Sequence, residues 1–336
     1  MAKTYKHLWP EITSFETLHA AYLKARKGKR YTPGVLRFSA MLEERLLELR
    51  EELRERRYRI SPYHRFEVYE PKKRQVASLP FREQAVQHAL IAVIEPIFDK
   101  RFIYDSYACR VGKGTHAGAD RITDWLRRAH RMWPETYVLK ADVKSYFASI
   151  DHAILKDLLR RWIQCDGTLW LMDLFIDSWN AKSGKGIPIG NLTSQLYANV
   201  YLHELDTFVK YDLRERFYLR YMDDFVVIGP DKGELNVLRA RIDRFLRERL
   251  ALQLNSRTSV FPERQGMDFL GYRIWRTHRL LRKRSVRRMR GRIRAWREGK
   301  VQTEEMEASV AAWLGHAEHA DMYNLQRELL GGTGLI

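Results

Sequence analysis

The sequence predicts a mixed fold of the α+β class, in which helices and strands are not arranged in regular alternation. Apolar residues recur at helical spacing in several long segments, whereas shorter runs are rich in β-branched and aromatic residues. These segments do not follow one another in the strict order of a parallel doubly wound sheet. With 45% hydrophobic residues among 336, the chain can bury a large core.

Each predicted element follows from a local pattern. Leu42, Leu46, Leu49 and Leu53 lie at helical spacing in a highly charged segment, which predicts an amphipathic helix. The runs at 217–219 and 225–228 are rich in β-forming residues and flank RYMDD, so they predict a β-hairpin. The other predicted elements are a strand at 64–69, a helix at 81–98, a buried strand at 137–142 and a long helix at 192–209.

The segment 276–297 is rich in lysine and arginine and contains no acidic residue. An apolar stripe of Val286, Met289, Ile293 and Trp296 runs through it, which predicts a helix with one basic face. Such a face is either an ordinary solvated surface or a surface that follows a nucleic-acid backbone. The cations that would contact the backbone are Arg282, Lys283, Arg284, Arg287 and Arg288.

The formal net charge of +18 favours a polyanionic partner, although ribosomal and membrane-surface proteins share such a surplus. The N-terminal residues contain no apolar signal region, and no apolar run reaches the roughly 20 residues that span a bilayer. Two cysteines do not make a disulfide framework. We therefore expect a soluble cytoplasmic protein.

Asp223 and Asp224 are adjacent carboxylates between apolar, strand-forming runs. In such surroundings two carboxylates repel each other and lose hydration, so a divalent cation such as Mg²⁺ is the natural compensation. Paired aspartates are also common on surfaces, but the apolar flanks weaken that interpretation. Asp142 ends the predicted strand 137–142, and with Asp223 it would form the cradle for two metal ions that phosphoryl-transfer enzymes use.

Several sequence blocks together resemble the motifs of reverse transcriptases. YMDD resembles motif C, ADVKSYFASID resembles motif A and GIPIGNLTSQLYANVYLHELD resembles motif B. LQLNSRTSVF and MDFLGYRI resemble motifs D and E, and YEPKKRQVASLPFREQAVQHAL resembles the fingers motifs. Their order and spacing agree across roughly residues 58–275. The resemblance implies a right-hand polymerase core, with an N-terminal helical extension at 1–57, fingers and palm at 58–272 and a short, basic helical thumb at 273–336.

The resemblance also implies a role for individual residues. Asp142, Asp223 and Asp224 would be catalytic and would bind two Mg²⁺ ions, or Mn²⁺ as a substitute, with the backbone of Val143. Phe147 would exclude ribonucleotides, unless it is simply a core aromatic, which Tyr146 is expected to be. The predicted dNTP-binding residues are Lys73, Arg74, Arg82, Phe147, Gly190, Ser194 and Gln195, and the predicted primer grip is Phe269, Leu270 and Gly271.

Three segments resemble one branch of this family, the enzymes of diversity-generating retroelements: EPIFDKRFIYDSYACRVGKGTHAG, the IGNLTSQ form of motif B, and SVAAWLGHAEHADMYNL. This resemblance implies a bacterial or phage-encoded enzyme that copies a template-repeat RNA into cDNA mutagenised at adenine. At Ile189, many relatives have glutamine, so Ile189 is expected to lower fidelity. A reverse transcriptase of a phage-defence or CRISPR-linked system and a catalytically inactive RNA-binding scaffold are the alternatives.

The same branch implies a small, basic, oligomeric accessory protein as a partner. Because this chain is itself basic, an acidic patch on the helix that contains Glu43, Glu44, Glu48, Glu51 and Glu52 would be a docking surface, unless arginines on that helix balance it. Other signals do not indicate a function. GKGTHAG lacks the spacing of a phosphate-binding loop, and His316 and His319 are expected to pack or contact the backbone rather than bind metal.

Overall fold

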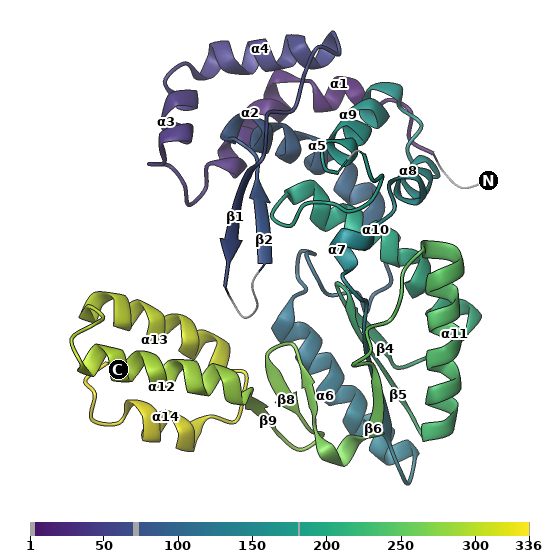
Figure 1. Ribbon diagram of the computed structural model, residues 1–336, viewed down its shortest axis with the longest axis vertical. Coiled ribbons are helices and arrows are strands. Elements are labelled where there is room, and N and C mark those ends of the chain that lie inside the picture. The colour runs from purple at the N-terminus through teal and green to yellow at the C-terminus, as the bar shows by residue number, and fades with distance from the viewer. Residues whose placement is uncertain (1–3, 70–73, 181, 336) are drawn as a thin grey trace. The chain divides into compact units, whose positions relative to one another are not determined.

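The computed structural model describes residues 4–69, 74–180 and 182–335 (Figure 1). The chain forms two compact units, each built from separate stretches of sequence. Unit 1 comprises Met1–Tyr104, Val143–Leu213 and Ile242–Ser256, and unit 2 comprises Asp105–Asp142, Arg214–Arg241 and Arg257–Ile336. The domain boundaries expected at residues 57 and 272 were drawn from the sequence motifs, and they stay a prediction. No helix in the described part of the chain is long and apolar enough to cross a membrane.

Unit 1 is mostly helical and carries one β-hairpin. The hairpin strands β1 (His64–Val68) and β2 (Arg74–Ser78) pair antiparallel, which confirms the predicted strand at 64–69. The helices are α1 (Trp9–Ile12), α2 (Phe15–Ala25), α3 (Pro33–Ser39), α4 (Leu42–Arg54), α5 (Phe81–Asp99), α7 (Tyr146–Ser149), α8 (His152–Arg160), α9 (Asp166–Asp177) and α10 (Leu192–Thr207), the last continued by a π-helical turn, η1 (Phe208–Asp212).

Helices α5 and α10 form the centre of this unit. Both are apolar on most of their circumference and are largely buried, as expected for helices surrounded by other elements. Helix α2 packs along α5, and α10 packs against both α5 and α8. The predicted helices at 81–98 and 192–209 are therefore confirmed. Helix α4 is amphipathic as predicted, with Leu46, Leu49 and Leu53 fully buried.

Unit 2 contains a four-stranded antiparallel sheet in the order β4-β5-β3-β6. Its strands are β3 (Tyr137–Asp142), β4 (Tyr218–Tyr221), β5 (Asp224–Gly229) and β6 (Ser259–Pro262). The central strands pair from Tyr137↔Gly229 to Asp142↔Asp224. Helix α6 (Thr115–Met132) packs against β4 and β5, and helix α11 (Lys232–Leu250) follows β5. The predicted strand at 137–142 and the predicted hairpin are confirmed.

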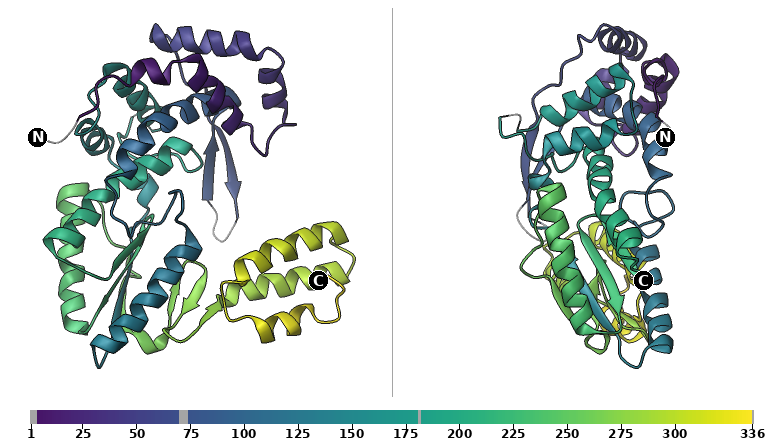
Figure 2. Two further views of the ribbon diagram at one scale, coloured as in Figure 1. Left: turned by 180° about the vertical axis from the view of Figure 1, so that it is seen from behind. Right: turned by 90° about the vertical axis from the view of Figure 1, so that its right-hand side faces the viewer.

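A three-stranded sheet and three helices complete unit 2. The strands are β7 (Met267–Phe269), β8 (Tyr272–Ile274) and β9 (Arg279–Leu281), and a 3₁₀ turn, η2 (Glu263–Gln265), precedes them. The helices are α12 (Lys283–Arg297), α13 (Thr303–Ala317) and α14 (Tyr323–Leu330), which Figure 2 shows as one group. Ion pairs from α12 join it to the other two helices, Arg292 to Glu305 and Arg290 to Glu328.

The prediction of a single helix at 276–297 is wrong in its first part. Residues Arg279–Leu281 form strand β9 and pair with β8, and the helix begins only at Lys283. Leu281 is buried in the unit's core, so pairing with β8 outweighs the helical preference of this basic segment. Downstream, Met289 and Ile293 are buried as the apolar stripe predicted.

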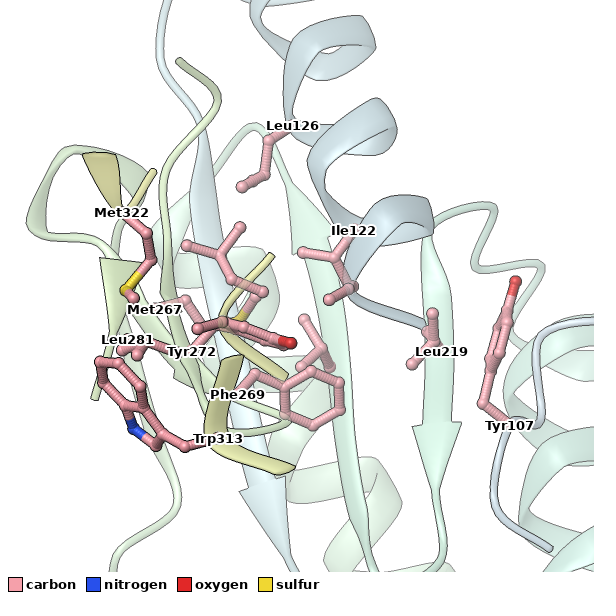
Figure 3. Close-up of a cluster of buried hydrophobic side chains, with 14 of the residues drawn as sticks. Tyr107, Ile122, Leu126, Leu219, Met267, Phe269, Tyr272, Leu281, Trp313 and Met322 are labelled. Carbon is pink, nitrogen blue, oxygen red and sulfur yellow. The ribbon is translucent and has the colours of Figure 1, made fainter. Parts of the chain in front are cut away.

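One hydrophobic cluster connects the parts of unit 2 (Figure 3). Ile122 and Leu126 enter it from α6, and Leu219 enters it from β4. Phe269 and Tyr272 come from the β7–β8 hairpin, and the labelled residues from β7, β9 and the C-terminal region are Met267, Leu281, Trp313 and Met322. The β7–β8 hairpin and the C-terminal helices therefore share a core with the four-stranded sheet.

Candidate active site

Asp223 lies in the two-residue turn that joins β4 to β5. Tyr221 and Asp224 are the last paired residues of the hairpin, which leaves Met222 and Asp223 as the turn. Met222 adopts a left-handed backbone with φ 57°, a conformation that residues other than glycine rarely adopt. The YMDD segment is therefore a tight, strained turn at the end of the sheet.

Asp142 is the last residue of β3, beside this turn. Burial and the neighbouring Asp142 carboxylate raise the pKa of Asp223 to about 7, and a side-chain hydrogen bond joins the two groups. Two carboxyl groups this close share a proton or a cation, because both cannot stay charged without compensation. The structure thus brings together the two residues expected to form a metal cradle.

Asp224 is placed differently from the other two carboxylates. Burial raises the pKa of Asp224, while the ammonium of Lys140, 4.0 Å away, lowers it. Among the residues described, no three His, Cys, Asp or Glu side chains gather into a metal site. Asp224 nevertheless pairs with Asp142 across strands β3 and β5, and the Asp142 carboxylate also raises its pKa, so the binding of metal by all three carboxylates stays a prediction. Two carboxylates fit Mg²⁺, which is commonly bound by one or two carboxylates together with substrate phosphates.

Val143 follows Asp142 directly. Its side chain is buried, and its backbone forms an antiparallel bridge with Leu254. The next amide, that of Lys144, donates to the carbonyl oxygen of Gln253 at 2.9 Å. These contacts hold the backbone that is expected to supply a metal ligand, and the ligand role itself stays a prediction.

Phe147 lies on the short helix α7 of unit 1. Tyr146 is 2% exposed and donates from its hydroxyl to the carbonyl of Ala198, which confirms it as the core aromatic. Phe147 is instead partly exposed. Its carbonyl oxygen accepts a hydrogen bond from Ile187 in motif B at 2.8 Å. The Phe147 ring is therefore available to a ligand and is held next to motif B.

The motif B turn is anchored to strand β2. The carbonyl of Ile189 accepts from the Ala77 amide at 3.0 Å. Gly190 has φ +116°, and a Cβ there would lie 2.8 Å from the Ala77 carbonyl oxygen. The closeness of strand β2 thus already requires glycine at position 190, independently of the role in dNTP binding that is expected of Gly190. Of the other predicted motif B residues, Ser194 is buried and Gln195 is exposed.

Gln87 was not predicted from the sequence, yet it supports motif B. It is 2% exposed on α5, and its side-chain oxygen accepts the Leu192 amide at 3.1 Å, the first residue of α10. Its side-chain nitrogen has no partner among the described residues. Gln87, Gly190 and Gln195 line a cavity of about 270 Å³. The signal in the sequence was a glutamine within an otherwise apolar helical segment.

The predicted triphosphate-binding cations have different surroundings. Lys73 lies outside the described residues. Arg74 begins β2, where it pairs with Val68. Arg82 forms an ion pair with Glu52 and lies 5.1 Å above the ring of Tyr58. These contacts hold the guanidinium of Arg82, and its expected phosphate contact stays a prediction.

The acidic face of α4 is also balanced internally. Glu48 pairs with Arg45, Glu51 pairs with Arg50, and Glu52 pairs with Arg82. Two of these arginines lie on α4 and Arg82 lies on α5, and together they balance three of the five glutamates. This arrangement therefore gives no support to α4 as the binding surface of an accessory protein.

The expected primer grip is the turn between β7 and β8. Phe269 is buried, while Leu270 and Gly271 both have positive φ, as in the two-residue turns that suit hairpins. The Arg282 amide donates to the Gly271 carbonyl oxygen, which ties this turn to the start of α12. A neighbouring cavity of about 470 Å³ is lined by residues that include Lys140, Arg273, Trp275, Arg282, Lys283 and Arg284.

The predicted basic face of α12 is confirmed. Its exposed side chains include Lys283, Arg284, Arg287 and Arg288. They lie opposite the buried Met289 and Ile293. This places a row of cations on one side of the helix, next to the basic cavity.

Three histidines from separate motifs meet around Tyr272. The rings of His116 and His319 stack at 3.7 Å, and the Tyr272 hydroxyl lies 2.9 Å from His116 Nδ1 and 3.1 Å from His316 Nδ1. A Cβ at Gly271 would lie 2.9 Å from His316 Nε2. As predicted, His319 packs, against His116, and His316 packs against Tyr272 and contacts the backbone of Gly271. The GKGTHAG segment contributes to the same cluster.

The histidine cluster predicts a loss of stability at low pH. Burial lowers the pKa of His116 and of His316, and neighbouring histidines lower both further. The unfolded chain therefore takes up protons more readily than the folded protein. The free energy of unfolding is highest above about pH 6.5, the ordinary pKa of histidine, and falls as the pH drops from there toward the lower pKa values of the folded protein. Thermal unfolding between pH 7 and pH 5 should show a smaller decrease for His316→Gln than for wild type. The exposed His130 provides the matched control, and an equal slope for wild type and His316→Gln would contradict the prediction.

A paired-carboxylate turn on an antiparallel sheet, next to basic surfaces, is the arrangement of a nucleic-acid polymerase palm. Residues 69–274 match the family model for reverse transcriptase (RNA-dependent DNA polymerase). The match covers more than half of the chain, and the chain therefore belongs to the reverse transcriptase family. It is an RNA-directed DNA polymerase, as the motifs implied.

Individual relatives agree with this assignment. Protein YkfC of Escherichia coli K12 is 28% identical over 331 residues, covering 82% of each chain. The group II intron-encoded protein LtrA of Lactococcus lactis is 23% identical, and the match covers 92% of this chain and 61% of LtrA. Apo telomerase from Candida tropicalis superposes with a TM-score of 0.53 at 12% identity, over 76% of this chain and 57% of that one. The last comparison confirms the α+β polymerase fold.

Proposed function

We propose that this chain is the polymerase of a diversity-generating retroelement. In this role it copies a template-repeat RNA into cDNA that carries errors opposite adenine, and the cDNA then replaces a target sequence by mutagenic retrohoming. Three segments around the catalytic motifs support this branch, namely 95–118, 189–195 and 309–325. Family membership and the similarity to an intron-encoded protein support RNA as the template.

The catalytic chemistry is proposed for Asp142 and Asp223, with Asp224 supporting them. Bound Mg²⁺ ions, two in the proposed mechanism, would lower the pKa of the attacking 3′-hydroxyl and neutralise the leaving pyrophosphate. The protein contributes a rigid pair of oxygen ligands, because one carboxylate ends β3 and the other lies in the Met222–Asp223 turn. Their mutual repulsion, which raises the pKa of Asp223, favours a cation at this place.

The substrates are proposed to be deoxynucleoside triphosphates and the template RNA with its cDNA. Arg74 is proposed to contact the triphosphate, and Phe147 to select the deoxyribose. The basic face of α12 suits a nucleic-acid backbone, because clustered Lys and Arg release counterions from phosphates. The neighbouring cavity adds Arg273 and the indole of Trp275. A small basic accessory protein is proposed as a partner, with RNA rather than α4 between the two basic proteins.

The position of Ile189 supports the proposal that the cDNA carries errors opposite adenine. Its backbone is fixed by the bond to Ala77, and its side chain is partly exposed next to Gly190. A branched apolar side chain offers no donor or acceptor to a base pair. A nascent pair at this position would therefore be held less strictly, and the weaker A·T pair would be affected most.

Replacing Ile189 with glutamine is expected to reduce misincorporation opposite template adenine. One hydrogen bond of about 1 kcal/mol corresponds to roughly a fivefold change in selectivity. Sequencing of cDNA made from a fixed RNA template measures the change, and errors opposite the other three bases should change less. Ile187→Gln is unsuitable as a control because Ile187 is buried, so Ile189→Val, which stays apolar, is the matched variant.

The outcomes separate the possible functions. Equal error spectra for wild type and Ile189→Gln, at comparable activity, would show that this side chain does not determine fidelity. A wild-type spectrum without excess errors opposite adenine would favour a phage-defence or CRISPR-linked reverse transcriptase. No extension of any primer with Mg²⁺ and dNTPs would favour the inactive scaffold.

A further inference from the structure

Arg220 in β4 is a fully buried arginine, with 0% of its surface exposed. A buried guanidinium is costly unless its donors are satisfied, so the contacts of this side chain indicate its purpose. Its backbone is held on both sides, because its amide donates to the Asp105 carbonyl and its carbonyl accepts from the Tyr107 amide. Nη2 donates to Ser106 Oγ at 3.2 Å.

The other end of the guanidinium reaches the YMDD turn. Nη1 of Arg220 donates to the carbonyl oxygen of Met222 at 2.9 Å. Met222 is the residue with the left-handed backbone, and its carbonyl belongs to the peptide that precedes Asp223. Hydrogen bonds from charged donors are stronger than neutral ones, so this bond is well suited to hold a strained turn.

The orientation of this peptide bears directly on Asp223. In a planar trans peptide the carbonyl and the following N–H point in opposite directions. With the Met222 carbonyl directed at Arg220, the Asp223 N–H points the other way. The Asp223 carboxylate accepts a hydrogen bond from that same N–H. Rotation of the peptide would remove both bonds at once and would release the carboxylate.

We propose that Arg220 is a positioning residue that orients the Met222–Asp223 peptide and thereby holds the Asp223 carboxylate beside Asp142. The inference rests on the proposed catalytic role of this pair. It adds a specific function for a side chain that is fully buried. A simple packing role would explain the burial of Arg220 but not the direction of its charged donor toward the turn.

The test compares Arg220→Met with Arg121→Met in the full-length protein. Arg121 carries the same side chain in the same region, where its Nε donates to the Asp105 carboxylate at 2.9 Å. Arg220→Met should lower kcat for single-nucleotide addition by about tenfold, the loss expected for one charged hydrogen bond. The Mg²⁺ concentration for half-maximal rate and the dissociation constant for Mn²⁺, measured by electron paramagnetic resonance without nucleotide, should both rise severalfold.

Three further measurements separate positioning from folding. KM for dNTP and the affinity for template–primer should stay within about twofold of wild type, because one charged contact away from substrate is removed. Arg121→Met should resemble wild type in metal binding and in kcat. If Arg220→Met does not fold, Arg220→Lys decides instead, because a lysine keeps the charge but cannot reach both acceptors as a guanidinium does.

Wild-type kcat and wild-type Mn²⁺ affinity in a folded Arg220→Met or Arg220→Lys variant would overturn the inference. So would an equal loss of Mn²⁺ affinity in Arg121→Met. Failure of the proposed function gives a different result, namely a wild-type protein that adds no nucleotide. The Mn²⁺ affinities of wild type and Arg220→Met can still be compared in that case. The two hypotheses are therefore tested separately.

Discussion

Replacing Asp223 with asparagine is expected to lower nucleotide addition on an RNA template by a factor on the order of 10³ or more. Asparagine matches the shape of aspartate but removes the charge and one metal ligand. The Met222–Asp223 turn should keep its form, because Arg220 holds its backbone. Template RNA affinity should therefore stay close to wild type, since the proposed backbone contacts lie on α12. Primer extension with Mg²⁺ and an RNA-binding titration measure the two effects.

Asp124→Asn provides the matched control for this prediction. Asp124 is partly exposed on α6 and pairs with Arg128 one turn along the helix, so the same substitution should leave extension unchanged. Extension above a few per cent of wild type in Asp223→Asn would contradict the assignment of Asp223 to catalysis.

The same variant should also stabilise the metal-free protein at high pH. The raised pKa means that folded Asp223 holds its proton up to about pH 7, whereas the unfolded carboxyl loses it near its ordinary value of 3.8. Stability of the wild type therefore falls as the pH rises between these values, because the folded state binds more protons. Asparagine does not titrate, so the difference in melting temperature should favour Asp223→Asn at pH 8 and diminish toward pH 4.

Local patterns were sufficient to predict much of the fold. Strand β3 is a short apolar run that ends in an aspartate, and helix α5 is a long apolar segment, and their predicted bounds agree with the structure to within a residue. Strand β9 was missed because its conformation depends on pairing with β8 and on burial of Leu281. A strand inside a strongly basic segment cannot reveal such a partner from its own composition. Tertiary contact outweighs helix propensity in these cases.

The site was predictable where neighbouring residues in the sequence indicate its chemistry. The pair Asp142 and Asp223 could be inferred because carboxylates that end apolar strands need compensation. The engagement of Arg82 with Glu52 could not be inferred, because it depends on how α4 packs against α5. The same limit applies to Gln87 and Arg220, whose roles depend on which backbone group the fold brings to them.

Glycine at position 190 illustrates how one residue can satisfy two requirements. The resemblance to reverse transcriptases placed Gly190 among the residues that bind the incoming dNTP. The structure supplies a separate reason, the approach of the Ala77 carbonyl from β2. A substitution at Gly190 would therefore disturb the attachment of motif B to the β1–β2 hairpin, and its effect on activity could not be assigned to nucleotide binding. Phe147 avoids this ambiguity, because its side chain is partly exposed and its hydrogen bond to motif B is made by its backbone.

Replacing Phe147 with alanine is expected to let the enzyme incorporate ribonucleotides. The ring is proposed to occupy the space of a 2′-hydroxyl, and its removal opens that space. A pocket that rejects one extra hydroxyl by shape achieves roughly a hundredfold discrimination, so the preference for dNTP over rNTP should fall by about that factor. Competition between a dNTP and its rNTP at one template position measures the ratio.

Two variants make the Phe147 experiment decisive. Phe147→Leu keeps a smaller apolar side chain and should give an intermediate ratio, as expected if volume is the cause. Phe15→Ala makes the same deletion on α2 and should leave the ratio unchanged. The fold should tolerate Phe147→Ala, because Tyr146 rather than Phe147 fills the core through its bond to the Ala198 carbonyl. An active Phe147→Ala enzyme with the wild-type ratio would show that another residue excludes ribonucleotides.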